Sequence, residues 1–201
     1  MTNLIDQTGL KSFHIQKIEE WTGLKCGEII FDSRINKWSQ KESELNKLIL
    51  GRKQFIVIIT TEKGEIFGGY IDEEIKKELK EDAIEYNDII RFRSTEKKSF
   101  MFSLETNGRI QQPLKIEMGD ISENSTISVS IDIENDDKWL LFGCGEIQIN
   151  KEEVKQFSCV VDFEDEIEER HHGYSKPFCD GEYDDGMLNY TPKNFFFIQM
   201  K

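Results

Sequence analysis

Residues 54–61 read QFIVIITT, and residues 65–71 read EIFGGYI. The first stretch is a continuous run of β-branched and apolar side chains, which is typical of a strand buried on both faces. Glu62, Lys63 and Gly64 lie between the two stretches and predict a turn. The sequence therefore predicts a β-hairpin at the centre of the fold.

Two adjacent glycines, Gly68 and Gly69, interrupt the returning strand. Glycine weakens the interior of a strand because it has no side chain to pack and loses the most backbone entropy on folding. A pair of glycines at this position indicates either a β-bulge or the close approach of a neighbouring backbone.

Further short segments flank this hairpin, and most of them have strand-like patterns. Apolar residues at helical spacing, with Ser12 as the N-cap and Gly23 near the stop, predict a helix before the hairpin. Ser39, followed by Glu42 in a capping-box spacing, predicts a second helix through Leu48. The charged stretch from Asp72 to Asp82 predicts a short amphipathic helix. For residues 164–192 we expect an irregular acidic segment. Other strands are predicted over residues 28–32, 99–104, 109–118, 125–133, 139–142, 146–149, 157–163 and 194–200, with a turn at Asn107-Gly108.

Many short strands and few helices predict a mostly-β (α+β) fold, a two-sheet antiparallel β-sandwich with a few peripheral helices. The chain has 201 residues and three prolines, and no linker-like stretch divides it. We therefore expect one globular unit. Residues 1–20 are expected to form an N-terminal helical extension, and residues 21–201 the domain itself.

The composition argues against several classes of partner. Asp and Glu number 39 and Lys and Arg 26, which gives a net charge of -13 that repels nucleic acid and anionic lipid. No run approaches the ~18 apolar residues of a membrane span, so we expect no membrane insertion. The N-terminus has no secretory pattern, so we expect a cytoplasmic protein whose cysteines are reduced. These are Cys26, Cys144, Cys159 and Cys179.

Metal and cofactor templates match poorly, and we expect neither group. Structural zinc sites use ligand pairs at close spacing, which the four cysteines and the pair His171-His172 do not provide. Residues 180–186 place acids at positions 1, 3 and 5 of a calcium loop, but Asp185 stands at position 6 and Thr191 at position 12, where glycine and glutamate are needed.

Catalytic templates also match poorly, and we expect no catalytic residues. The sequence contains no G-x-S-x-G elbow and no phosphate-binding loop. His14, His171 and His172 are the histidines. Cys159 and Cys179 lie near His171 in sequence, which is the one hint of a thiol nucleophile with a nearby base.

An ordered set of motifs resembles the TLDc domain family, over nearly the whole chain from Trp21 onward. The set runs WTG (21–23), GEIIFDSR (27–34), the strand 55–61, EIFGGY (65–70), FSL (102–104), FGCGEI (142–147) and the last strand 195–200. The residues that carry the motif are Gly27, Glu28, Asp32, Ser33, Phe67, Gly68, Gly69, Phe102, Ser103, Leu104, Gly143 and Gly145.

The resemblance implies a sandwich of two antiparallel sheets and a non-catalytic role as a protein-interaction domain. Animal members of the family are linked to oxidative-stress resistance and to binding of the vacuolar proton-pumping ATPase. The resemblance thus implies a monomer that reaches endolysosomal or vacuolar membranes through a partner, with partner-binding residues unknown. Two departures concern that contact: residues 35–38 read INKW where the family often has Asp-Gly, and Glu146 stands where Asp is usual.

Two alternatives remain open beside this role. One is a thiol-based redox enzyme, which requires a cysteine of low pKa that alkylates at neutral pH. The other is a cation- or ligand-binding β-sandwich that uses the acidic loops between Asp162 and Tyr190, for which calcium would raise the melting temperature.

Overall fold

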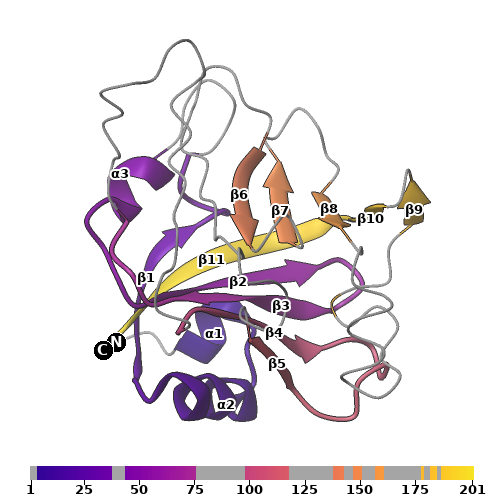
Figure 1. The fold of residues 1–201 in the computed structure, drawn as a ribbon, viewed down its shortest axis with the longest axis horizontal. Helices are drawn as coiled ribbons and strands as arrows, with labels where there is room; N and C mark the ends of the chain where they lie inside the picture. The colour runs from indigo at the N-terminus through magenta and orange to yellow at the C-terminus, as the bar shows by residue number, and fades with distance from the viewer. Residues whose placement is uncertain are drawn as a thin grey trace.

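The computed structural model describes residues 4–37, 44–75, 98–117, 138–142, 147–150, 157–160, 178, 182–184 and 187–201. Three helices and eleven strands lie within these residues (Figure 1). The helices are α1 (Leu4–Thr8), α2 (Ser12–Thr22) and α3 (Leu45–Ile49). The strands are β1 (Cys26–Asp32), β2 (Phe55–Thr61), β3 (Ile66–Ile71), β4 (Phe100–Glu105), β5 (Leu114–Glu117), β6 (Lys138–Phe142), β7 (Ile147–Asn150), β8 (Phe157–Val160), β9 (Glu182–Asp184), β10 (Met187–Tyr190) and β11 (Pro192–Met200).

Six strands form one antiparallel sheet in the order β1-β11-β2-β3-β4-β5. The expected hairpin is present, because β2 pairs with β3 through the turn at Glu62 and Lys63. The last strand, β11, lies between β2 and β1, and β1 forms one edge of the sheet. Both faces of β2 are buried, since Phe55, Val57 and Ile59 belong to one apolar cluster and Ile56 and Ile58 to another, which explains its continuous apolar sequence.

One face of this sheet, here called face A, carries most of the buried phenylalanines. Alternate residues of each strand point to the same side. The cluster on face A includes Phe55, Val57, Ile59, Phe67, Met101, Phe195 and Phe197, together with Phe31 of β1 and Leu45 and Ile49 of α3. The rings of Phe31 and Phe195 stack at 5.3 Å between centroids. Burial of such side chains stabilises the fold by roughly 1.5–3 kcal/mol each.

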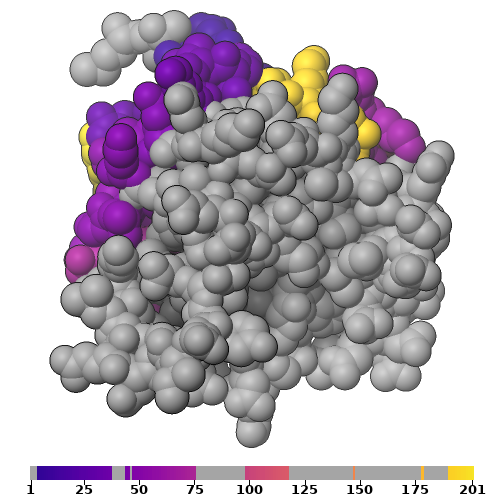
Figure 2. All heavy atoms as spheres, turned by 90° about the horizontal axis from the view of Figure 1, so that it is seen from above, coloured from indigo at the N-terminus to yellow at the C-terminus, as the bar shows by residue number. Residues whose placement is uncertain are grey.

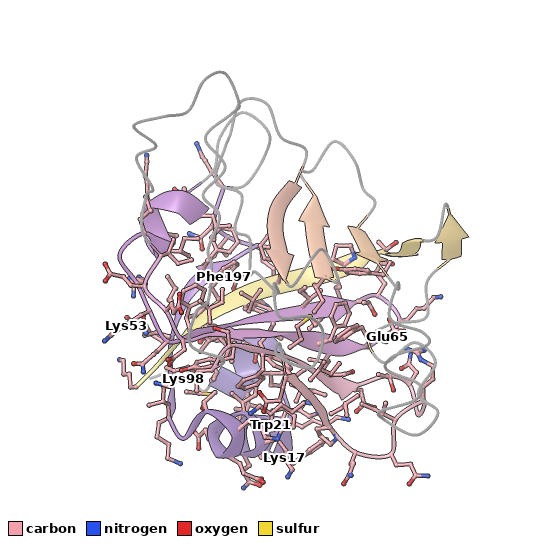
Figure 3. All side chains as sticks on the ribbon, viewed as in Figure 1. Lys17, Trp21, Lys53, Glu65, Lys98 and Phe197 are labelled. Carbon is pink, nitrogen blue, oxygen red and sulfur yellow. The ribbon has the colours of Figure 1, made fainter. Side chains whose placement is uncertain are left out.

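The opposite face, here called face B, is covered by the N-terminal helices. Its cluster includes Ile56, Ile58, Tyr70, Phe100, Phe102, Phe196 and Ile198 of the sheet, and Leu10 and Ile18 of the helical segment. Leu10 and Ile18 are each 1% exposed, so the N-terminal segment packs on the sheet. Figure 3 shows Trp21 and Phe197 on opposite sides of the sheet: Trp21 belongs to α2, and Phe197 lies on the side of β6 and β7.

Two small sheets lie over face A (Figure 1). One has the order β8-β10-β9 and the other pairs β6 with β7, and all of these pairings are antiparallel. Ile147 of β7, Phe178 and Tyr190 of β10 belong to the cluster on face A. The Phe67 ring meets those of Tyr190 and Phe178 at 5.0 and 5.7 Å between centroids. The expectation of a mostly-β antiparallel fold is therefore confirmed.

The start of α2 differs from the prediction. The N-cap is Lys11 rather than Ser12, and Ser12 is the first helical residue. The Nδ1 atom of His14 accepts the Lys11 backbone N–H at 3.2 Å, so this imidazole takes the place of the Glu or Gln side chain of a capping box. The predicted stop is confirmed, because Gly23 adopts φ of 69° at the C-cap.

Three further predictions change in detail. Residues 164–192 contain β9 and β10, so this segment is not irregular throughout; short strands among acidic residues give little periodic signal. No register shift occurs at Gly68 or Gly69, which rules out the bulge interpretation. The described part of 72–82, Asp72 to Ile75, is not helical. Ser39, Glu42, the predicted strand 125–133, Gly143 and Gly145 lie outside the described residues.

Backbone hydrogen bonds join Lys25, just before β1, to Lys201, just after β11. The Lys25 N–H donates to the Lys201 carbonyl at 2.7 Å, and the Lys201 N–H donates to the Lys25 carbonyl at 2.8 Å. Figure 2 shows yellow atoms of the C-terminal part of the chain beside indigo and purple atoms of its N-terminal part at the surface. None of the helices in the described ranges is long and apolar enough to cross a membrane.

Candidate functional site

The expected motif residues fall into two separate groups. Gly27, Glu28, Asp32 and Ser33 lie on β1 or directly after it. Phe67, Gly68 and Gly69 lie on β3, directly opposite Ser103, Phe102 and Met101 of β4. Leu104 also lies on β4, in the cluster on face B. The structure thus joins the β3 and β4 motifs in the sheet interior and leaves the β1 motif at the sheet edge.

The β3–β4 group explains why glycine is needed at residue 68. A Cβ atom on Gly68 would overlap the carbonyl oxygen of Val57 on β2. Because Val57 belongs to the central strand, with partners on both sides, this backbone has little freedom to move. Of the two interpretations in the sequence, close backbone approach is the one that holds.

Ser103 is buried at this pairing and its hydroxyl has no hydrogen-bond partner. It lies opposite Phe67 on β3 and Leu114 on β5. A hydroxyl without a partner weakens a core. Since aromatic and aliphatic side chains surround it, the arrangement offers no group that would activate it as a nucleophile.

The β1 group builds a fixed turn at residues 33–36. The Asp32 carbonyl accepts the N–H groups of Ile35 at 3.1 Å and Asn36 at 2.9 Å, and the Asn36 Oδ1 accepts the Asp32 N–H at 2.8 Å. The turn is attached to β11, because Ser33 and Phe195 exchange hydrogen bonds at 3.0 and 3.1 Å. Asx-type bonds of this kind hold a turn in one conformation.

Charged side chains reinforce the same turn from both faces of the sheet. Arg34 donates to both carboxylate oxygens of Asp32, through Nε at 2.9 Å and Nη2 at 2.6 Å, and its guanidinium lies 5.0 Å from the centre of the Phe196 ring. Glu44, just before α3, accepts from the Asn36 side chain at 3.2 Å and the Lys37 N–H at 3.0 Å. Burial raises the pKa of the Asp32 carboxyl, but the Arg34 hydrogen bonds outweigh burial and hold that pKa below its ordinary value.

The tip of this turn presents an apolar side chain to solvent. Ile35 is 80% exposed, compared with 43% for Phe13 and 39% for Leu50, the other exposed large apolar residues of the described chain. In the sequence, Ile35 stood out only as part of the departure at residues 35–38. The signal that could have identified the turn is the Asp32-x-x-x-Asn36 spacing, because both residue types bond to nearby backbone.

A second polar cluster, which includes Glu65, lies at the turn end of the β2–β3 hairpin (Figure 3). Glu65 is 1% exposed; it accepts from the Thr61 hydroxyl and pairs with Arg109 at 3.0 Å. Asn107, at φ of 52°, donates to the Lys63 carbonyl at 2.7 Å. These bonds tie the turn after β4 to the turn after β2, which is a structural role.

Among the cysteines of the thiol alternative, Cys26 is the one whose side chain the structure describes. The pKa of the Cys26 thiol is raised to about 12, chiefly because the thiol is buried. This cysteine is therefore not an activated nucleophile. Cys144, Cys179, His171 and His172 lie outside the described residues, as does most of the acidic segment 162–190. Within the described ranges, no three Cys, His, Asp or Glu side chains gather as metal ligands would.

The candidate site is therefore the turn 33–36, where the exposed side chain of Ile35 is presented by a backbone that partly buried hydrogen bonds hold in place. Comparisons with known proteins add no family to this geometry. No protein-family model matches the chain, and no curated protein matches it.

Proposed function

We propose that this chain is a non-catalytic protein-interaction domain of the TLDc type, and that the turn 33–36 contacts its partner. The resemblance of the ordered motifs supports the type of domain, and the mostly-β antiparallel fold agrees with it. The vacuolar proton-pumping ATPase is the leading candidate partner, and a link to oxidative-stress resistance follows from the same resemblance.

The observation that carries the proposal is the exposure of Ile35 on a preorganised turn. Ordering a flexible loop on binding costs free energy, roughly 0.5–1.5 kcal/mol for each immobilised side chain. Here the hydrogen bonds of Asp32, Ser33 and Asn36 already fix the backbone of the turn in the unbound chain. An exposed apolar side chain on a fixed base fits a pocket on a protein surface.

The surroundings of the turn favour a protein partner over an anionic one. The positive charge of Arg34 is already paired with Asp32 at 2.6 Å. With a net charge of -13, the chain as a whole repels phosphate-rich surfaces. Recognition at this turn therefore depends on apolar contact more than on charge.

The test uses the full chain and the purified peripheral sector of the vacuolar ATPase in a surface-binding assay. We expect the wild-type chain to bind, and Ile35→Ser to weaken binding about tenfold or more, as for a central apolar anchor. Phe13→Ser is the matched control, because Phe13 is also an exposed large apolar residue but lies on α2 and not in the turn. It should bind as the wild type does.

Two outcomes would contradict the proposal in different ways. No binding of the folded wild-type chain at micromolar concentration would remove the pump as partner. Equal binding by the Ile35→Ser and wild-type chains would remove the turn as the contact. Rapid alkylation of one cysteine at neutral pH in the native chain would favour the thiol alternative instead.

A further inference from the structure

His14 is a buried titratable group for which the proposed function has no use. His14 is fully buried, with 0% of its surface exposed, although it is only the third residue of α2. The Nδ1 atom accepts the backbone N–H of Lys11, so the proton of the neutral ring lies on Nε2. The Nε2 atom has no hydrogen-bond partner.

Protonation of His14 would remove the bond that caps α2. The added proton goes to Nδ1, because Nε2 already carries one, and Nδ1 then becomes a donor that faces the Lys11 N–H donor. The Lys11 N–H loses its acceptor, and a cation is left at a buried position. The neutral ring is thus compatible with the docked helix, and the charged ring is not.

The charges around His14 come from its own segment and from the sheet below. Lys11 lies at the start of α2, and Glu105 lies at the end of β4; their side chains pair at 2.8 Å. The pKa of His14 is lowered to about 4: burial is the largest influence, Lys11 adds to the decrease and Glu105 opposes it. The ring of Phe13, 4.1 Å away between centroids, adds no compensating charge.

The helical segment that His14 holds in place is attached to the sheet mainly by side chains. Leu10 and Ile18 fill face B, and the Trp21 ring lies 6.2 Å from those of Phe100 and Phe102. The backbone bonds to β11 begin only at Lys25. Residues 4–22 can therefore separate from the sheet without breaking any strand pairing.

We propose that residues 4–22 form an acid-released strap over face B, with the neutral His14 imidazole as its latch. Mild acidification increases the fraction of chains in which His14 is protonated, the bond to the Lys11 N–H is lost and the aromatic residues of β3 and β4 are uncovered. This device is separate from the turn 33–36 and does not depend on the identity of any partner.

The direction of the effect follows from the pKa of His14 in the two states. In the released strap the pKa returns to the ordinary value of 6.5, whereas in the docked strap it is about 4. The stabilisation by the neutral ring is complete above pH 6.5 and is lost as the pH falls toward 4. Linkage then raises the opening equilibrium about 20-fold between pH 7 and pH 5.

Hydrogen exchange of the full chain, read by mass spectrometry and corrected for intrinsic rates, tests this inference. We expect protection of residues 4–22 to fall about 20-fold between pH 7 and pH 5, while protection of β2 stays constant. His14→Asn is the matched variant, because the Asn Oδ1 can accept the Lys11 N–H and does not titrate. In this variant the pH dependence of residues 4–22 should disappear.

Three results would overturn the inference. The first is constant protection of residues 4–22 in the wild-type chain. The second is an equal fall in β2, which would mean global unfolding. The third is an unchanged pH dependence in His14→Asn. If that variant does not fold, nuclear magnetic resonance of the wild-type imidazole decides: the inference requires an Nε2–H ring that stays neutral at pH 5.5.

Discussion

The two faces of the six-stranded sheet are built from the same strands but are covered in different ways. Face A is covered by residues that are far apart in the chain, among them Ile49, Ile147, Phe178 and Tyr190. Face B is covered by one continuous segment, which contributes Leu10 and Ile18. Both covers bury apolar side chains to a similar degree.

This difference determines which cover can move alone. The cover of face A includes strands that pair with each other, so its removal would break two small sheets. The cover of face B is a helical segment joined to β1 through a short connection. Stability is not uniform in a fold, and a segment without strand pairings opens at lower free energy than the sheet below it.

The largest expected effect comes from a change that damages both faces together. Gly68→Ala places a Cβ atom on the Val57 carbonyl of the central strand, and we expect a loss of about 4 kcal/mol or more. Gly27→Ala is the control: its Cβ would lie 2.7 Å from the Gln199 carbonyl oxygen, but at the sheet edge beside a register shift. We expect about 1–2 kcal/mol there. Urea unfolding measures both, and equal losses would refute the close-approach explanation.

The same isoleucine-to-alanine substitution, made once under the cover of face A and once under the cover of face B, tests whether the two covers open independently. Ile147→Ala and Ile18→Ala both remove a buried side chain, and such truncations cost about 2–5 kcal/mol. We expect Ile147→Ala to lower the global free energy of unfolding. Ile18→Ala should instead increase exchange in residues 4–22 with little change in β2. If both variants lose protection uniformly, the two covers are not independent.

The smallest expected effect lies at the turn 33–36, where the two faces meet. In Asp32→Asn the ion pair with Arg34 becomes a neutral hydrogen bond, and we expect a loss of about 1–2 kcal/mol at pH 7. The folded pKa of Asp32 is depressed, so its stabilisation is present above the ordinary value of 3.8 and is lost as the pH falls below it. The stability difference between wild type and variant should therefore shrink between pH 5 and pH 3. A constant difference would contradict this account.

Much of the fold could be predicted because its strongest signals are local. The apolar run of β2, the turn at Glu62 and Lys63, and the helix stop at Gly23 each lie within a few residues. The site was harder to predict, since its parts are distant. Asp32, Glu44 and Phe195 all form hydrogen bonds with residues of the turn 33–36, yet these three residues span most of the chain. His14 was noted only as one of three histidines, because burial and capping are not visible in its type or spacing.

The sequence by itself determined that the chain folds as a mostly-β antiparallel structure, because alternation and β-branched runs are local properties of the backbone and side chains. Tertiary structure alone decided that β11 lies between β1 and β2, that Gly68 meets the Val57 backbone, and that Ile35 is exposed while His14 is buried. The physical reason is that burial and pairing depend on which distant segments fill the same space. The helical pattern of residues 12–22 predicts an apolar stripe but not the face of the sheet that receives it.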